Sequence, residues 1–359
     1  MRRPTLEFVE RDPGADVLVV TNMWPEPDRP VYGIFVQRQV ESLRREGVRC
    51  DVLYLRGFAS RGAYPAAALR FLRATFTWRG RYRLVHVHAG ETALAARFLL
   101  GLPILVSYCG DDLLGDPRED GAIPLVNRAR AGLVRRHANL FPATITKSQE
   151  MHDRLPARAR RRNTVLPNGV DTEHFRPMDR AGARRRLGWG QDEKIVLFAG
   201  TKPNSTRKRL SLAQRACALA EERIVNLRLH VCAAVPPEDM PLLMNAADCL
   251  LVTSSLEGSP NVVKEALMCN LPVVATDCGD VRLLLQGVEP SWLCDSQPVN
   301  LAAAIVSCLM RGERSNGRER ALPQLSSAAI AKRVKALYAE LDTGLDPPTR
   351  REEEALRAN

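Results

Sequence analysis

Short apolar runs alternate along the chain with longer segments in which apolar residues return every three or four positions. The first runs are DVLVV at 16–20 and CDVLYL at 50–55, and residues 33–47 between them have the helical spacing. Uninterrupted apolar runs are typical of strands buried on both faces of a parallel sheet, and the spaced pattern is typical of amphipathic helices. The alternation therefore predicts an α/β protein built on parallel sheets.

The same alternation returns in the second half of the chain. Residues 193–216 predict a strand, a polar loop and a helix, and 227–232 and 248–252 predict further strands. An amphipathic helix is predicted at 326–342. A chain of 359 residues is too long for one ordinary hydrophobic core. It suits two domains of about 150 residues each.

Composition favours a globular protein in a reducing compartment. Hydrophobic residues make up 45% of the chain and charged residues 26%. The nine cysteines are scattered without a C-x-x-C pair, which is typical of reduced core thiols. No apolar stretch follows Arg2 and Arg3, and no run of about 18 apolar residues occurs. We therefore expect a cytoplasmic protein without a signal peptide or a membrane span.

The positive charge is unevenly distributed. The formal net charge is +11, and residues 1–175 hold 27 Lys and Arg against 19 Asp and Glu. A basic first domain favours an anionic partner such as a lipid phosphate or a membrane surface. No nucleic-acid-binding motif accompanies the charge, so nucleic acid is not expected as a partner. An Arg-rich genome is the alternative explanation of the same excess.

Residues 254–280 carry the most informative pattern in the chain, which reads as a loop, a short helix and a strand. Ser259 is predicted to cap the helix, with Pro260 at its first position and Asn270 at its end. The N–H groups of Asn261 and Val262 would then be available to phosphate oxygens.

Two carboxylates mark this unit. Glu265 could accept hydrogen bonds from a ribose diol, and Glu257 could reach a transferred sugar. An ordinary loop, helix and strand with two solvated glutamates is the alternative interpretation.

The segment EGSPNVVKEALMCNLPVVATDCG resembles the E-x7-E signature of family 4 glycosyltransferases. The resemblance implies a retaining enzyme with the GT-B fold, in which two Rossmann-like parallel-sheet domains face each other across a cleft. It implies that Glu257 lies by the donor sugar and that Glu265 binds the nucleotide ribose. Whether Glu257 acts as a nucleophile or as a stabiliser is left open by the sequence.

Two further segments extend the resemblance over nearly the whole chain. The opening TNMWP…YGIFVQRQV is similar to the first domain of the family, which places Gly33 by the donor phosphates. PNGVD at 167–171 is similar to the segment that joins the domains. The predicted divisions are 1–170 for an acceptor-side domain, 171–325 for a nucleotide-sugar domain, 326–345 for a last helix that can cross back, and 346–359 for a disordered tail.

The chain departs from the family pattern at two positions. Cys109 replaces a histidine that contacts the donor sugar in many relatives. Asp111 and Asp112 are predicted to supply polar contacts instead, Asp111 among the catalytic residues and Asp112 on the acceptor side. A solvated pair of aspartates is the alternative, and the spacing is not that of a D-x-D metal motif.

The second departure is Thr201, which stands where the family usually carries an arginine on the donor diphosphate. Lys208 matches the lysine that accompanies that arginine. We expect Lys202 or Arg207 to supply the second positive charge. A basic, solvated loop is the alternative.

His86 and His88 alternate on one predicted strand and share a face. They could be taken for a metal pair, but no third ligand is evident, and packed histidines are the commoner outcome. The resemblance places His88 on the acceptor side of the cleft. We expect neither a metal nor a cofactor, with the nucleotide-diphosphate sugar as donor substrate.

The sequence therefore predicts transfer of a sugar from a nucleotide-diphosphate sugar to an acceptor hydroxyl, in cell-surface polysaccharide or glycolipid synthesis. The acceptor would be a sugar or a lipid-linked molecule, either anionic or neutral, reached at the inner membrane face by peripheral association. A nucleotide-sugar epimerase of the same fold is one alternative. A non-catalytic GT-B scaffold is another, favoured by Cys109 and Thr201.

Overall fold

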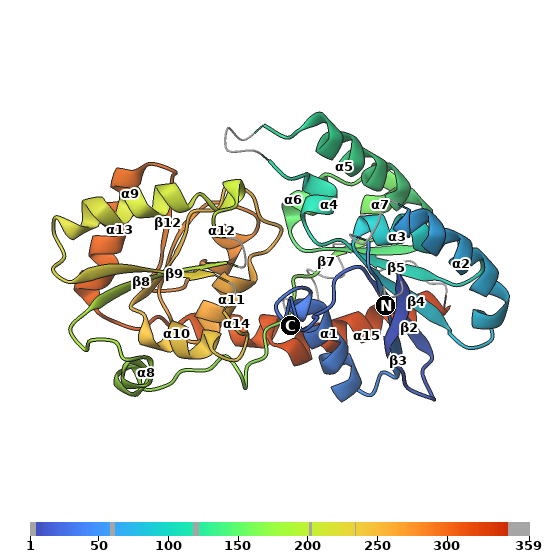
Figure 1. The fold of residues 1–359 in the computed structure, drawn as a ribbon, viewed down its shortest axis with the longest axis horizontal. Coiled ribbons are helices and arrows are strands. Elements are labelled where there is room, and N and C mark those ends of the chain that lie inside the picture. The colour runs from blue at the N-terminus through green and yellow to red at the C-terminus, as the bar shows by residue number, and fades with distance from the viewer. Residues whose placement is uncertain (1–4, 58–61, 118–121, 201–202, 234, 344–359) are drawn as a thin grey trace.

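Two β-sheets, one in each half of the chain, organise the fold (Figure 1). The computed structural model describes residues 5–57, 62–117, 122–200, 203–233 and 235–343. The tail predicted to be disordered, 346–359, lies outside these residues.

The first sheet has seven strands, and the five inner ones are buried along their whole length. In spatial order the strands are β1 (Leu6–Glu10), β3 (Cys50–Leu55), β2 (Val17–Thr21), β4 (Leu84–His88), β5 (Ile104–Ser107), β6 (Ala143–Thr146) and β7 (Asn163–Val165). All neighbouring strands pair in parallel except β1, which runs antiparallel to β3 at the edge. The predicted parallel sheet is thus present, with one antiparallel strand added at its edge, where a strand can reverse because no βα crossover is needed.

Helices cover both faces of the first sheet. On one face lie α2 (Ala63–Trp78), α3 (Gly90–Ala96), α4 (Asp111–Leu114), α5 (Leu125–His137), η1 (Ala138–Leu140), α6 (Gln149–Asp153) and α7 (Ala157–Arg160). The other face is covered by α1 (Ile34–Arg45) and by the last helix, α15 (Ser327–Thr343). Alternate residues of β2, β3, β4 and β5 enter the two cores, as the strand periodicity requires.

The second sheet has five strands, and all of their pairings are parallel. In spatial order they are β12 (Trp292–Cys294), β11 (Val273–Thr276), β10 (Cys249–Val252), β8 (Lys194–Gly200) and β9 (Leu227–Ala233). One face packs on α9 (Leu210–Glu221) and α13 (Pro298–Arg311). The other packs on α10 (Met240–Ala246), α11 (Asn261–Met268), α12 (Val281–Leu284) and α14 (Gly317–Leu325), with α8 (Arg180–Leu187) outside α10.

The chain crosses between the domains twice, and the two crossings pair with each other. Val170 N–H donates to the Leu325 carbonyl at 2.8 Å, and Ser327 N–H donates to the Val170 carbonyl at 2.8 Å. After the second crossing, α15 runs beside α1 under the first sheet (Figure 1). There Tyr338 is buried and its hydroxyl lies 2.7 Å from His86 Nδ1.

Within the described ranges, no helix combines the length and the apolar character needed to cross a bilayer.

The paired crossings leave no room for a side chain at Gly169. A methyl group there would lie 2.7 Å from Ser327 Cα. We expect Gly169→Ala to lower the free energy of unfolding by about 1–3 kcal/mol, because backbone must shift to relieve the contact.

The matched control is Gly132→Ala in α5, where a methyl group would meet nothing within 4 Å and helix propensity would improve. Denaturant unfolding of both variants measures the difference. Equal stability of the two would contradict a tight crossing.

Candidate functional site

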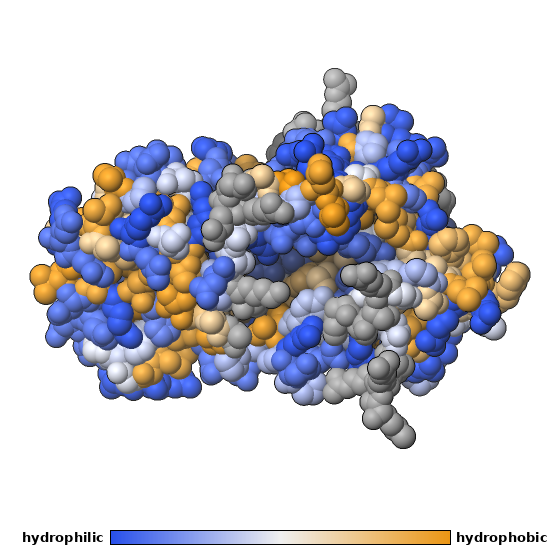
Figure 2. All heavy atoms as spheres, turned by 45° about the horizontal axis from the view of Figure 1, so that its top comes forward, coloured by the Kyte–Doolittle hydropathy of each residue, from blue (hydrophilic) through white to orange (hydrophobic). Residues whose placement is uncertain are grey.

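Loops at the carboxyl ends of the two sheets face each other, the edge at which parallel α/β sheets bind ligands. The domains touch here: the Thr206 hydroxyl donates to the Pro117 carbonyl at 2.9 Å, and a methyl group added to Gly258 would lie 3.4 Å from Gly110 Cα. Figure 2 shows a hollow between the two halves of the molecule. The residues of the candidate site lie around this contact between the domains.

Helix α11 begins at Asn261, one residue later than the sequence pattern predicts. Pro260 takes the position before the first helical residue with an extended ψ of 112°, so Ser259 is not the cap. The Ser259 hydroxyl instead accepts a hydrogen bond from Lys264 Nζ at 3.0 Å. No side chain caps α11, so the N–H groups of Asn261 and Val262 remain oriented toward a possible anion.

Glu257 forms an ion pair with Lys208, with Oε1 and Nζ 2.7 Å apart and both side chains largely buried. Burial raises the pKa of Glu257, but the positive charges of Lys208 and Arg207 outweigh it and leave the pKa below its usual value. Glu257 is therefore ionised at neutral pH. Gly279 supports its loop, because a Cβ there would lie 2.7 Å from the Glu257 carbonyl oxygen and its φ of +59° favours glycine.

A neighbouring arginine positions Lys208. Lys208 ends the short helix η2 (Thr206–Lys208), and Arg209 follows with a φ of +52°. The Arg209 guanidinium donates to the carbonyls of Thr253 and Ser254 at the end of β10. The side chain of Arg209 thus attaches the segment that carries Lys208 to the end of β10. Lys202 and Thr201 lie outside the described residues, so the predicted second cation can be followed only at Arg207, which is half-buried.

Glu265 contacts the opposite domain. Its Oε1 lies 3.3 Å from the Arg38 guanidinium, which projects from α1. Burial raises the pKa of Glu265, and the positive charges of Arg38 and Lys264 only partly offset this. The carboxylate predicted to bind ribose is thus paired across the cleft in this structure.

Lys264 connects α11 to the PNGVD segment that joins the domains. Its side chain is fully buried, and its Nζ donates to the Asn168 carbonyl at 3.1 Å as well as to Ser259. Burial lowers the pKa of Lys264 to about 8. Asn261, the first residue of α11, accepts a hydrogen bond from the Asn168 side chain at 3.4 Å.

In the first domain, Asp112 is buried and its carboxylate accepts hydrogen bonds from four backbone N–H groups. The donors are Gly90, Cys109, Gly110 and Leu113, at 2.9–3.1 Å. In this structure the oxygens of Asp112 are bonded to the loop that they hold together, and its predicted acceptor-side role stays a prediction. Asp112 is a positioning residue.

Asp111 is half-exposed beside Asp112, with its Oδ2 3.5 Å from Arg130. Its catalytic role stays a prediction. Cys109, which replaces the family histidine, is half-buried, and burial together with the Asp112 charge raises the pKa of its thiol well above the usual value. The thiol is therefore neutral at physiological pH.

Gly33 immediately precedes α1, as predicted, with a φ of +78°. An added Cβ would lie 2.3 Å from the Met23 carbonyl carbon. The glycine is therefore already required by the packing of its own loop, and the predicted contact with donor phosphates remains a prediction.

His86 and His88 lie on one face of β4 with ring centroids 4.4 Å apart. His86 is fully bonded, to Tyr338 and to Ser107 Oγ at 2.8 Å. His88 is buried, its Nδ1 has no partner within the described part of the chain, and burial lowers its pKa well below the usual value. Among the residues that the structure describes, no three His, Cys, Asp or Glu side chains are grouped to hold a metal ion. The acceptor-side role of His88 stays a prediction.

Sequence patterns did not identify three basic residues at this site. Arg38 and Lys264 are described above. The third is Lys147, directly after β6, whose buried Nζ has no hydrogen-bond partner among the described residues. Arg38 and Lys264 sit in ordinary helix patterns and Lys147 follows a strand, so only the folded structure shows that these residues are buried or paired here.

Two family models match the chain. The model described as Glycosyltransferase Family 4 matches residues 10–174, and the model described as Glycosyl transferases group 1 matches 191–311. The chain belongs to glycosyltransferase family 4. The resemblance seen in the E-x7-E and PNGVD segments is thereby confirmed.

Relatives and solved structures agree with this family 4 assignment. A D-inositol 3-phosphate glycosyltransferase of Geodermatophilus obscurus is 28% identical over 276 residues, which are 65% of this chain and 61% of that protein. The match thus spans about three fifths of the relative's length.

Two solved structures share the fold. Sucrose-phosphate synthase from Thermosynechococcus elongatus has a TM-score of 0.73 at 18% identity, covering 92% of this chain and 100% of that one. Anabaena HepE, crystallised with UDP and glucose, has a TM-score of 0.66 at 16% identity, covering 90% and 99%. The GT-B fold predicted from the sequence is confirmed.

The four N–H donors around Asp112 give a test of its positioning role. We expect Asp112→Asn to lower the free energy of unfolding by about 1–3 kcal/mol, because an amide NH₂ would face backbone donors in a buried site. Asp111→Asn, which alters one half-exposed ion pair, should change stability by about 1 kcal/mol or less. Chemical denaturation compares them, and a variant of Asp112 as stable as that of Asp111 would refute the role.

Proposed function

We propose that this family 4 glycosyltransferase transfers a sugar from a nucleotide-diphosphate sugar to an acceptor hydroxyl with retention of anomeric configuration. One observation carries the proposal. The Lys208–Glu257 pair and the uncapped start of α11, with Glu265 on the same helix, lie at one edge of the second sheet and face the first domain. Positive charge for a diphosphate and carboxylates for sugar hydroxyls are thus present together.

Donor binding is assigned to the second domain. The N–H groups of Asn261 and Val262 and the cations Lys208 and Arg207 would hold the diphosphate. Glu265 would accept hydrogen bonds from the ribose hydroxyls, exchanging its pairing with Arg38 for the ligand. Bound UDP in the structurally similar HepE supports a nucleotide-diphosphate donor.

Catalysis would depend on opposite charges at the two ends of the breaking bond. As the sugar–phosphate bond lengthens, negative charge develops on the diphosphate and positive charge on the sugar. Lys208 and the α11 N–H groups stabilise the first, and the ionised Glu257 stabilises the second. The lowered pKa of Glu257 supports this, because a protonated acid could not stabilise a cationic sugar. We propose that these protein charges suffice without a metal ion.

The acceptor is assigned to the first domain, whose positive charge favours an anionic molecule. The related D-inositol 3-phosphate glycosyltransferase carries a phosphorylated cyclitol in its name, which supports an anionic acceptor. A sugar linked to a lipid phosphate, or an anionic cell-surface polysaccharide, would carry negative charge in the same way.

The proposal is tested by screening UDP-, GDP- and ADP-sugars for thermal stabilisation and then offering acceptors with the best donor. Transfer in EDTA with retained configuration is the expected result. A donor-only reaction identifies an epimerase instead if it yields an epimer, and loss of transfer in EDTA refutes the metal-independent mechanism.

Glu265→Gln should weaken nucleoside-diphosphate binding by about 1–3 kcal/mol, or about 5- to 150-fold in Kd, because a charged acceptor for the ribose hydroxyls is lost. Isothermal calorimetry measures the affinity. Glu222→Gln, exposed directly after the end of α9, is the control. Unchanged affinity in the Glu265 variant would remove the ribose role.

Lys208→Met should reduce affinity for a nucleoside diphosphate at least tenfold while leaving the weak binding of the bare nucleoside unchanged, because only the diphosphate is charged. Lys332→Met, exposed on α15, is the control. Equal losses for both ligands would show that Lys208 does not contact phosphate.

A further inference from the structure

Large apolar side chains are exposed on one face of the first domain. Among its described residues, every exposed large apolar side chain belongs to α2, to α5 or to the turns that follow α3 and α5. They are Leu69, Leu72, Phe76, Leu100, Leu125, Val126, Leu133 and Leu140. Helix α3 packs between α2 and α5, so these residues share one outer layer, called here the α2–α5 face.

Helix α2 has an apolar stripe on both sides. Its inner stripe, which includes Ala67 and Phe71, is buried in the core. Its outer stripe follows the same helical spacing, with Leu69 50%, Leu72 40% and Phe76 84% exposed. A second stripe on the solvent side cannot serve the core of this domain, and in Figure 2 hydrophobic residues are visible at the end of the molecule where Figure 1 places α2.

The charges carried by α2 and α5 themselves have one sign, and one of their arginines, Arg130, is paired with Glu91 of α3 and Asp111 of α4. Neither α2 nor α5 contains an Asp or a Glu, and their six arginines are Arg70, Arg73, Arg128, Arg130, Arg135 and Arg136. At the start of α5, Leu125 and Val126 are each 79% exposed. Exposed apolar residues interleaved with arginine alone are typical of helices that lie in the interface of an anionic membrane.

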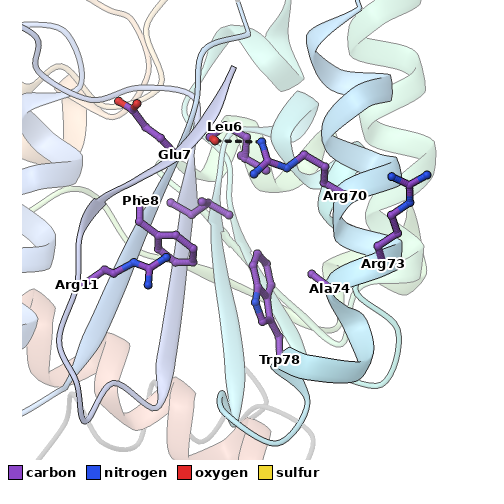
Figure 3. A pocket seen from close by; sticks show the side chains of 9 residues that line it. Leu6, Glu7, Phe8, Arg11, Arg70, Arg73, Ala74 and Trp78 are labelled. Atoms are coloured by element: carbon purple, nitrogen blue, oxygen red, sulfur yellow. Dashed lines mark hydrogen bonds between the residues drawn. The ribbon is translucent and has the colours of Figure 1, made fainter. Parts of the chain in front are cut away.

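A pocket of about 630 Å³ lies beside α2, between this helix and the edge strand β1 (Figure 3). Phe8 and Trp78 form its aromatic part, with ring centroids 5.9 Å apart, and Arg11 lies 4.0 Å over the Phe8 ring.

Arg70 and Arg73 reach the same pocket from α2, and Arg70 donates to the Leu6 carbonyl at 3.1 Å. The lining carboxylate, Glu7, is paired with Arg56 at 2.5 Å. The pocket therefore presents aromatic surface together with cationic groups that suit a phosphate headgroup.

We infer that the α2–α5 face, with its adjoining arginine pocket, docks on an anionic lipid bilayer. The apolar stripe would enter the interfacial region while the arginines contact lipid phosphates. The absence of acidic residues from both helices favours this partner over a protein of mixed charge. Docking itself does not depend on the proposed reaction.

The position of the face relative to the cleft gives docking a purpose, and this step rests on the proposed function. Helix α5 starts shortly after Pro117, which contacts Thr206 of the second domain. The exposed start of α5 is thus close in the chain to the point where the domains meet. A bilayer on this face would hold a lipid-linked acceptor near the cleft.

The test uses the full chain in flotation with vesicles of phosphatidylcholine alone and of phosphatidylcholine mixed with phosphatidylglycerol. We expect binding to the anionic vesicles that weakens as salt is raised, and little binding to the neutral ones. The variant Leu69→Ser, Leu72→Ser, Phe76→Ser should lose binding at least tenfold, and Arg73→Glu with Arg136→Glu should lose it similarly. Val225→Ser, Val299→Ser and Met310→Ser, exposed in the second domain, form the matched control.

Thermal stabilisation by UDP-sugar is read on every variant, so that an intact donor site and a lost membrane surface are distinguished. Equal vesicle binding by the α2 variant and the control would overturn the inference. So would binding to neutral vesicles alone, or dimerisation in sedimentation or nucleic-acid binding through this face without vesicle binding.

Discussion

The paired hydrogen bonds between Val170 and the segment around Ser326 are the constraint on which the arrangement of the two domains depends. Both crossings of the chain meet there, backbone against backbone, with no side chain at Gly169 to separate them. Because the second crossing delivers α15 to the first domain, a core of that domain contains chain from before and from after the second domain. The Asn168 carbonyl accepts a hydrogen bond from the Lys264 amine. The segment that joins the domains therefore also positions the start of α11.

The charged groups of the site have been shifted by different physical causes. Glu257 is buried yet ionised, because Lys208 and Arg207 stabilise its charge more than burial destabilises it. At Glu265 and Lys264 burial dominates, so the neutral form of each is favoured relative to water. A bound diphosphate and ribose would add charge and hydrogen bonds in this region.

The distribution of positive charge acquires a structural meaning once the helices are placed. The excess of the first domain includes six arginines on α2 and α5, without a neutralising carboxylate on either helix. The cations of the donor site, in contrast, are few and individually held, as Lys208 is by the loop that Arg209 attaches to the sheet. Positive charge is thus spread over two helices in the first domain and held by individual contacts at the site in the second domain.

The sequence alone determined the α/β architecture, the helical spacing of α1, the position of the hinge near Gly169 and the pair of glutamates in α11 and its loop. All of these depend on local periodicity or on contiguous motifs. Tertiary structure decided what local patterns do not contain. Arg38 and Glu265, which are paired across the domains, are 227 residues apart in the chain. The Ser259 hydroxyl accepts a hydrogen bond from Lys264 in place of capping the helix. Asp112 and Asp111 are adjacent residues of the same type, and the sequence does not distinguish them. Asp112 is buried and holds its loop because four N–H groups converge on its carboxylate only after β4 and β5 pair.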